Sequence, residues 1–328
     1  MLNTPVRSRQ PTRQPWTLDR LLLERSIALG MSLASGTFSA YSSALNSYLS
    51  FCNLHHFPID PTADTLSLYI TWMSAHIKPD SVYSYLSGIV NQLEPHYPHV
   101  RDSRKHPLVC RTLAGCRRRF GTAQTRKEPL SASDLHLILE QLPRPWNFDD
   151  VLFICLLLVG FLGLLRLGEI TVPDSVKQLD HRRIPPRSAT LFTPSQFTFL
   201  LPAHKADKFF EGNRILITPR PHLPDPLLPL QSYLCGRDSR FPFFPQLWLC
   251  ANGRPPTRTW FLHRLHALSN HHFGGHSLRA GGATDLALHG ASLQVIQAAG
   301  RWASNAFQVY IRKNPFLIHA ALTTKSTP

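Results

Sequence analysis

The sequence has no closely spaced cysteine pairs and no long apolar run. Its six cysteines stand at positions 52, 110, 116, 155, 235 and 250, and no two of them form a CxxC pair. Scattered cysteines in a chain of 328 residues argue against a disulfide scaffold and against a zinc module. We therefore expect reduced and mostly buried thiols.

The longest apolar run, from Val151 to Leu165, has fifteen residues. A membrane-spanning helix needs about 20 residues, so this run predicts a buried core helix and no membrane contact. The first sixteen residues have no apolar stretch of the kind that signal peptides carry, and we expect no signal peptide. Residues 1–16 are polar, basic and contain proline, which predicts a disordered arm.

Acidic residues are few. Asp and Glu number 20 against 35 Lys and Arg, which gives a formal charge of +15 and a pI of about 10.0. The hydrophobic content of 43% is enough for ordinary cores, which excludes a wholly disordered protein. A folded chain with this charge is typical of proteins that bind nucleic acid or another polyanion. The alternative is a charge that serves solubility alone.

Apolar residues recur at three- and four-residue steps between residues 17 and 120, a pattern that predicts helices. Prolines fall between the periodic stretches, where helices break. We therefore expect a bundle of four or five helices over 17–120, a linker over 121–130, and a second domain over 131–328.

The second domain is predicted to be mainly α with a small antiparallel β-sheet. Ser131 or Ser133 can cap its first helix. The remaining predicted segments follow in order: a core helix over 149–165, strands over 197–201 and 214–218, an irregular Pro-rich stretch over 219–246, and helices from 257 to about 320.

Residues 101–127 carry nine basic side chains and one acid, Asp102. The run overlaps an apolar stripe from Val109 to Phe120, which predicts a helix with one core face and one cationic face. Such a helix suits contact with phosphates, although a charge run is more often a solvated face. The candidate DNA contacts are Lys78, Ser81, Arg104, Lys105, Arg111, Arg117, Arg118, Arg119, Arg126 and Lys127.

A second set of polar residues suggests chemistry. Arg166 directly follows the apolar run, where an arginine is costly to bury unless it meets an anion. Glu169, one helical turn on, can hold its guanidinium, and the alternative is that Arg166 is the polar end of a core helix. His276 and Arg279 stand three residues apart, so a helix presents them on one face. Each of these motifs is weak by itself.

Taken together, the motifs follow one another in this order: an arginine, a lysine, an HxxR box, the triplet GRW and a tyrosine. This order resembles the catalytic signature of the tyrosine recombinases, the phage-integrase family. The first arginine lies in LLRLGE, the lysine in LLPAHKAD and the tyrosine in FQVYIR. The matching residues are Arg166, Glu169, Lys205, His276, Arg279, Trp302 and Tyr310.

The resemblance extends over about residues 17–320. The stretches SGTFSAYSSALNSYLSFC and KPDSVYSYLSGIVNQL resemble the family's helical core-binding domain, which has a SAM-like bundle. The resemblance thus implies a SAM-like helical bundle followed by a catalytic domain. The wording of the boxes is most similar to crypton-type recombinases of eukaryotic mobile elements, which implies a nuclear location.

The resemblance also implies a mechanism. Tyr310 attacks a DNA phosphodiester, Arg166 and Arg279 clamp its oxygens, and Lys205 protonates the leaving 5′-oxygen, with Lys208 as the alternative acid. His276 accepts a proton or holds the phosphate, and Trp302 packs the site and donates its indole N–H. The product is a 3′-phosphotyrosine, and no metal, cofactor or ATP is implied. The expected partners are double-stranded DNA and, on DNA, further copies that form a tetramer.

Three other functions are open to the sequence. One is a domesticated DNA-binding protein with weak or no catalysis, and another is a type IB topoisomerase that relaxes supercoils. The third is metal binding at His55-His56 or His271-His272, which is the weakest because neither pair has Cys or carboxylate partners at ligand spacing.

Overall fold

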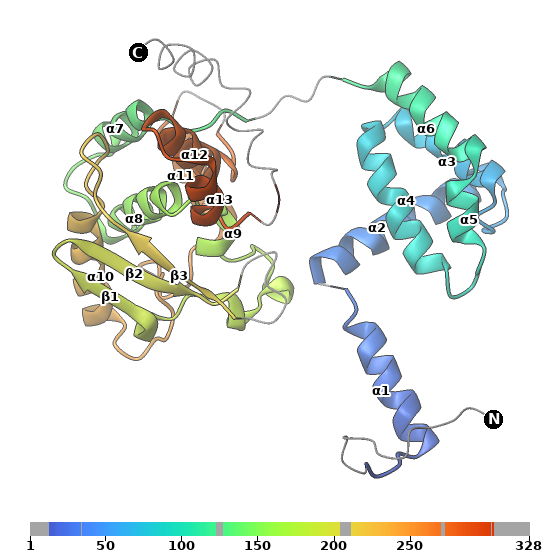
Figure 1. Cartoon of the computed structure of the whole chain (residues 1–328), viewed down its shortest axis with the longest axis horizontal. Helices are drawn as coiled ribbons and strands as arrows, with labels where there is room; N and C mark the ends of the chain where they lie inside the picture. The colour runs from blue at the N-terminus through green and yellow to red at the C-terminus, as the bar shows by residue number, and fades with distance from the viewer. Residues whose placement is uncertain are drawn as a thin grey trace. The chain divides into compact units, whose positions relative to one another are not determined.

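The computed structural model describes residues 13–33, 35–122, 127–203, 211–269, 273–302 and 304. The chain divides into two compact units, Met1–Gln124 and Thr125–Pro328 (Figure 1). Each unit buries an apolar core of its own. None of the helices in the described ranges has both the length and the apolar character that a membrane span requires.

The described part of the N-terminal unit is helical. Helix α2 packs on α4, and α3 packs on α6, around an aromatic core in which Tyr48 and Phe51 meet Tyr69 edge-on at 5.5 Å. Helix α1 differs from the others because none of its residues is buried. The helices are α1 (Leu18–Gly30), α2 (Ser35–His55), α3 (Ala63–Ser74), α4 (Pro79–Leu93), α5 (Val100–Lys105) and α6 (Pro107–Phe120).

Local sequence explains where these helices begin. Pro79 and Pro107 each occupy the first helical position of α4 and α6, where the missing N–H has no partner to lose. The Thr62 hydroxyl accepts from the Thr65 N–H at 3.2 Å and caps α3. Helix α6 buries Val109, which lies on the predicted apolar stripe.

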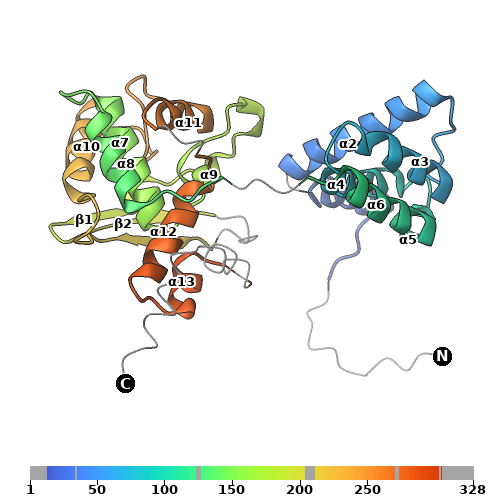
Figure 2. The same ribbon diagram turned by 90° about the horizontal axis from the view of Figure 1, so that it is seen from above.

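The C-terminal unit is built around α8. Its helices in the described ranges are α7 (Ala132–Gln141), α8 (Phe148–Leu162), α9 (Leu167–Ile170), α10 (Leu227–Arg240), α11 (Arg258–Ala267), α12 (Ser277–Leu288) and α13 (Leu293–Ala299). Ser131, one of the two predicted caps, is the N-cap of α7, and it also forms a capping box with Asp134. Residues 152–162 of α8 are all buried, and both α10 and α12 pack on this helix (Figure 2).

A three-stranded antiparallel sheet covers part of the same core. Its strands are β1 (Thr190–Thr193), β2 (Gln196–Leu201) and β3 (Asn213–Ile217), in the order β1-β2-β3. Phe197 pairs with Ile217 and Leu201 with Asn213. Phe197, Phe199 and Ile217 point into the core that α8 fills, which follows from the two-residue period of a strand. The mainly α architecture with a small antiparallel sheet confirms the predicted fold class.

Two predicted segments differ from the structure. The stretch over 219–246 contains α10 and is therefore not irregular throughout. Pro226 is the N-cap of α10 and Pro229 lies in its first turn, where proline costs no helical hydrogen bond. The core helix ends at Leu162 instead of residue 165, because Leu164 adopts a left-handed conformation with φ of 50°.

Candidate active site

The chain leaves α8 through Gly163, Leu164 and Leu165 and reaches Arg166, the N-cap of α9. The Arg166 backbone N–H donates to Glu169 Oε2 at 2.9 Å, and its Nη1 donates to Glu169 Oε1 at 2.7 Å. The Glu169 side chain is 5% exposed and that of Arg166 is 25% exposed. Glu169 therefore holds the Arg166 guanidinium, as the sequence predicts, and the structure adds that Arg166 still reaches solvent.

Arg279 comes to the same place from α12. Its Nη1 donates to the Leu164 carbonyl oxygen at 2.7 Å, and its Nη2 donates to the Gly300 carbonyl oxygen. Its guanidinium carbon lies 4.1 Å from the centroid of the Trp302 ring, which covers it. Arg279 is consequently 1% exposed.

Two glycines after Arg279 let α12 approach its neighbours. A Cβ on Gly281 would lie 2.1 Å from the Leu130 carbonyl oxygen, and a Cβ on Gly282 would lie 2.1 Å from the Phe161 carbonyl oxygen. Only glycine fits at such a distance. The sequence RAGGAT thus brings Arg279 to the end of α8.

Arg301 is a third guanidinium in the site, and sequence reasoning missed it. Its Nη2 lies 3.3 Å from both Glu169 Oε2 and the Leu164 carbonyl oxygen, and its Nη1 lies 3.3 Å from the Gly163 carbonyl oxygen. Burial lowers the pKa of the Arg301 guanidinium, and the Glu169 carboxylate opposes this shift. The only sequence signal was its place inside the GRW triplet.

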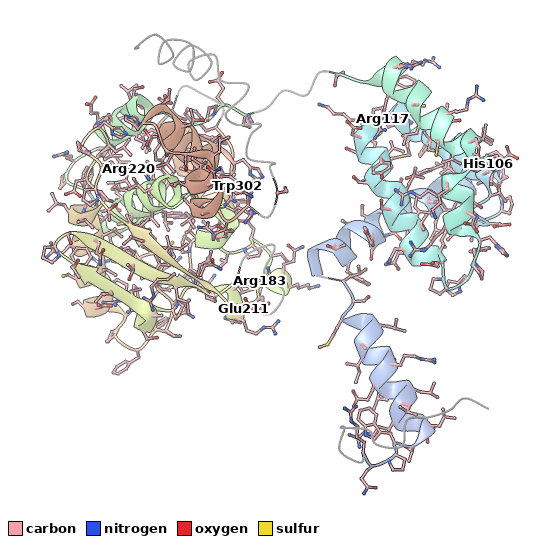
Figure 3. The ribbon with its side chains drawn as sticks, viewed as in Figure 1. His106, Arg117, Arg183, Glu211, Arg220 and Trp302 are labelled. Carbon is pink, nitrogen blue, oxygen red and sulfur yellow. The ribbon has the colours of Figure 1, made fainter. Side chains whose placement is uncertain are left out.

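Trp302 follows directly, just beyond α13 (Figure 3). A Cβ on Gly300 would lie 1.6 Å from the Trp302 ring, so the glycine before the arginine makes room for the indole. The Gln297 side-chain amide donates to the Trp302 carbonyl oxygen at 3.1 Å and fixes the backbone there. The GRW triplet is therefore one structural element in which each residue has its own place.

His276 is the N-cap of α12 and its side chain is exposed, whereas Arg279 is buried. The HxxR box thus gives two side chains of different exposure, although sequence spacing put them on one helical face. The reason is that His276 stands at the boundary of the helix. Lys205, its alternative Lys208, and Tyr310 lie outside the described residues.

The described site has three guanidinium groups, from Arg166, Arg279 and Arg301, and one carboxylate, from Glu169. Such a group of cations in partly buried surroundings favours an anion. Arginine forks match the oxygens of a phosphate, since they donate two parallel hydrogen bonds. The arrangement is therefore suited to hold a phosphate group.

The predicted DNA contacts of the N-terminal unit are placed on α4, α5 and α6. The guanidinium groups of Arg104 and Arg117 lie 5.1 Å and 5.4 Å from the Tyr83 ring centroid, and the ring is half-exposed. Arg117 Nε also donates to Asp80 Oδ1 at 2.9 Å, and Arg104 Nη2 donates to the Ser87 hydroxyl at 2.9 Å.

The other predicted contacts in this unit are exposed: Lys78, Ser81, Lys105, Arg111, Arg118 and Arg119. The cations of α6 occupy the helix surface that Val109, Leu113 and Cys116 leave to solvent. Lys127 is also exposed and belongs to the C-terminal unit, where its stem lies against Gly274. Arg126 lies outside the described residues.

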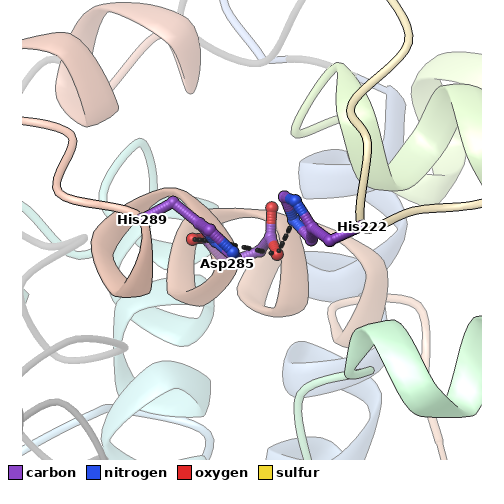
Figure 4. A group of neighbouring side chains, drawn as sticks. All are labelled: His222, Asp285 and His289. Carbon is purple, nitrogen blue, oxygen red and sulfur yellow. Dashed lines mark hydrogen bonds and ion pairs between the residues drawn. The ribbon is translucent and has the colours of Figure 1, made fainter.

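A second titratable cluster in the C-terminal unit contains His222, Asp285 and His289 (Figure 4). His222 Nε2 lies 2.8 Å from Asp285 Oδ1, and Arg220 Nη1 donates to Asp285 Oδ2 at 2.9 Å. The two imidazole rings stack with centroids 3.7 Å apart and an interplanar angle of 17°. Parallel stacked rings do not aim two nitrogens at one ion, and Arg220 already balances the carboxylate. The geometry favours a structural ion pair over a metal site.

Comparison with known proteins gives one relative in sequence and several in fold. No family model matches the chain. The chain is 25% identical over 297 residues to an integrase/recombinase XerD homolog of Selenomonas ruminantium. The alignment covers 83% of this chain and 79% of the relative.

Solved structures share the fold at low identity. The chain resembles the XerH site-specific recombinase bound to its palindromic difH substrate, with 15% identity, a TM-score of 0.62, and coverage of 88% of this chain and 80% of that one. It also resembles a lambda integrase tetramer bound to a Holliday junction, with 13% identity, a TM-score of 0.57, and coverage of 89% and 76%. The chain therefore shares the fold of these recombinase and integrase structures, and its sequence relative is named as an integrase/recombinase.

Proposed function

We propose that the protein is a tyrosine recombinase that breaks and rejoins DNA at a specific site through a 3′-phosphotyrosyl intermediate. The observation that carries the proposal is the convergence of Arg166, Arg279 and Arg301 on Glu169 and Leu164 at the end of α8. This convergence supplies a phosphate site in a unit that has the catalytic fold of that family.

In the proposed reaction, the Tyr310 phenol oxygen attacks the scissile phosphorus and the bond to the 5′-oxygen breaks. The phenol proton passes to His276 or to water, and Lys205 gives a proton to the departing 5′-oxygen. Arg166 and Arg279 stabilise the charge that grows on the non-bridging oxygens. The phosphodiester is exchanged for a phosphotyrosine, so a second 5′-hydroxyl can reverse the step without an energy source.

The burial of Arg279 adds a condition. Its guanidinium is 1% exposed and lies under the Trp302 ring. Contact with a phosphate therefore requires Trp302 to move off the guanidinium when DNA binds. Arg166 is 25% exposed and needs no such movement to meet the phosphate first.

The proposed DNA surface includes the face of the N-terminal unit around Tyr83, where Arg104 and Arg117 are already held by neighbouring groups. Phosphate contacts from these cations position the duplex, and they give affinity that depends on salt. The sequence relative is named as an integrase/recombinase and the structural neighbours are DNA complexes of such proteins, which supports DNA as the partner.

Three finer points belong to the same proposal. The active assembly is a tetramer on DNA, a state that the lambda integrase on a Holliday junction illustrates. Truncation after Lys313 removes an apolar set of side chains, namely Phe316, Leu317, Ile318, Ala320, Ala321 and Leu322. We expect the truncated protein to keep single-site DNA binding and to lose higher-order complexes in sedimentation, and recombination with them. The crypton type and a nuclear location rest on the wording of the sequence boxes alone.

A suicide substrate tests the function. Duplex fragments that the protein binds are selected first and then prepared with a nick near the scissile phosphate, so that the cleaved fragment diffuses away. The wild-type protein is expected to accumulate a covalent adduct, and Tyr310→Phe is expected to bind the same DNA without forming it. An adduct from Tyr310→Phe would show that another residue is the nucleophile. DNA binding without an adduct from wild type would favour the domesticated binding protein.

A further inference from the structure

We propose that Arg301 is a positioning residue that holds Arg166 and Arg279 together for their work on the phosphate. The inference rests on the proposed function and assigns a role to a residue that the resemblance left without one. The inference is argued from the hydrogen-bond acceptors that Arg301 shares with Arg166 and Arg279.

The shared acceptors are one carboxylate and one carbonyl. Glu169 Oε1 accepts from Arg166, and Glu169 Oε2 lies 3.3 Å from Arg301 Nη2. The Leu164 carbonyl oxygen accepts from Arg279 Nη1 at 2.7 Å and lies 3.3 Å from the same Arg301 Nη2. Arg301 therefore touches one partner of each of the two proposed phosphate-binding arginines.

The backbone is unusual at both ends of this contact. Leu164 has φ of 50° and Arg301 has φ of 55°, and both are left-handed conformations that side chains other than glycine seldom adopt. Each turns a segment at the end of a helix, α8 for Leu164 and α13 for Arg301. Uncommon backbone of this kind persists where surrounding contacts over-determine it, and it concentrates at functional sites.

The chemistry of the side chain fits a positioning role. The Arg301 side chain is 9% exposed, so it has little surface to offer to DNA directly. A planar guanidinium fork can donate to the Gly163 and Leu164 carbonyl oxygens and to Glu169 at once, whereas a lysine ammonium on its flexible stem holds such a geometry poorly. Arg301 also places a buried positive charge next to the pair of Arg166 and Glu169.

Removal of Arg301 leaves the two shared acceptors with other partners, although the Gly163 and Ala299 carbonyl oxygens lose the hydrogen bond from Arg301 Nη1. Glu169 keeps two hydrogen bonds from Arg166, and the Leu164 carbonyl keeps that from Arg279. Arg301→Gln is therefore expected to fold. A matched control is Arg264→Gln in the same unit, where Arg264 Nη1 donates to Asp150 Oδ1 at 2.7 Å and the side chain is 27% exposed.

The experiment measures the single-turnover rate of adduct formation by the full chain on the selected nicked duplex, with DNA affinity and melting temperature measured beside it. Arg301→Gln is expected to slow adduct formation about 100-fold, the usual cost of misplaced catalytic groups, with DNA affinity unchanged. Arg301→Lys should fall between Arg301→Gln and wild type. Arg264→Gln should keep the wild-type rate.

A second substrate separates positioning from a general loss of structure. Replacing one non-bridging oxygen of the scissile phosphate by a methyl group removes the negative charge that the arginines stabilise. The deficit of Arg301→Gln relative to wild type should shrink on this neutral substrate, whereas a folding defect would persist on it.

The outcomes decide separately on the two claims. A wild-type rate for Arg301→Gln, or an equal deficit on both substrates, overturns the role of Arg301 while the recombinase proposal stands. The absence of any adduct from the wild-type protein overturns the recombinase proposal and this inference with it.

Discussion

The Trp302 ring lies over the Arg279 guanidinium at 4.1 Å and closes the site from one side. A cation over an aromatic face in desolvated surroundings contributes about 2 kcal/mol. Trp302→Leu should therefore lower the free energy of unfolding by about 2 kcal/mol, and Trp302→Phe should lower it less because a ring remains. Urea unfolding followed by circular dichroism measures both. Equal stability of Trp302→Leu and wild type would show that the ring contributes nothing there.

The packing of α12 gives a prediction about glycines. A Cβ on Gly281 would lie 2.1 Å from the Leu130 carbonyl oxygen, so Gly281→Ala must push α12 away from its neighbours. We expect a loss of about 1–3 kcal/mol, the range for overpacked cores. Gly115→Ala in α6 is the control, because nothing lies within 4 Å of the added Cβ and alanine favours a helix. If both variants melted at the same temperature, the close approach would be wrong.

The thiols should divide into two classes. All six cysteines are free, Cys110 and Cys235 are exposed, and the other four are buried, in agreement with the expectation of mostly buried thiols. Burial raises the pKa of Cys250 to about 12 and also raises that of Cys155. Thiolates are the reactive form, so raised pKa values slow labelling at every pH below them.

We therefore expect a disulfide reagent at pH 8 to label Cys110 and Cys235 rapidly and the others only after denaturation. Peptide mapping of the labelled protein identifies the sites. Raising the pH from 7 to 9 should leave Cys250 unlabelled in the native protein, because its pKa lies well above this range. Rapid labelling of Cys155 or Cys250 in the native protein would contradict the burial of these residues.

Much of the architecture was predictable because its signals are local. Ser131 and Asp134 form a capping box that chain order alone reveals, and the apolar run that becomes α8 has a composition that only a core helix fits. Burial alternates in β3, where Ile215 and Ile217 are buried and Leu216 is exposed, and β2 turns Phe197 and Phe199 into the core. By contrast, β1 is short and half-buried, so its residues carry no such alternation.

The site was predictable in part for the same reason. Glu169 lies three residues after Arg166, and their ion pair at 2.7 Å confirms the predicted contact. Arg301 escaped prediction because its partners, Gly163, Leu164 and Glu169, are more than 130 residues away along the chain. Helix α10 escaped because its prolines suggest a break unless the position of the first turn is known.

The cations around Tyr83 give a prediction about salt. Each phosphate contact contributes about 0.9 to the slope of log affinity against log salt concentration. If Arg104 and Arg117 both contact DNA, replacing both by Ala should lower the magnitude of that slope by about 2. The single control is Arg101→Ala, because Arg101 is not among the predicted DNA contacts and Glu94 holds it through both carboxylate oxygens, and this variant should change the slope less.

Filter binding or fluorescence anisotropy at several salt concentrations measures the slopes. Replacing Arg117, Arg118 and Arg119 together by Ala extends the series along α6. An unchanged slope in both multiple variants would place this face of the N-terminal unit away from the DNA.

The general acid gives the last prediction, since two lysines compete for the role. Lys205 follows β2, which ends at Leu201 opposite Asn213 of β3, and Lys208 stands three residues further on. A lysine with a pKa of about 10.4 is protonated at neutral pH and can give its proton to a departing alkoxide. Lys205→Ala should therefore slow adduct formation about 10²–10⁴-fold, the usual contribution of a general acid.

A substrate with sulfur in place of the 5′-bridging oxygen separates the two lysines. Its leaving group is a thiolate, whose conjugate acid has a pKa near 8.5, and a thiolate departs without a proton from the protein. On this substrate the rate of Lys205→Ala should return close to wild type, while Lys208→Ala should behave alike on both substrates. Rescue of Lys208→Ala alone would assign the acid to Lys208.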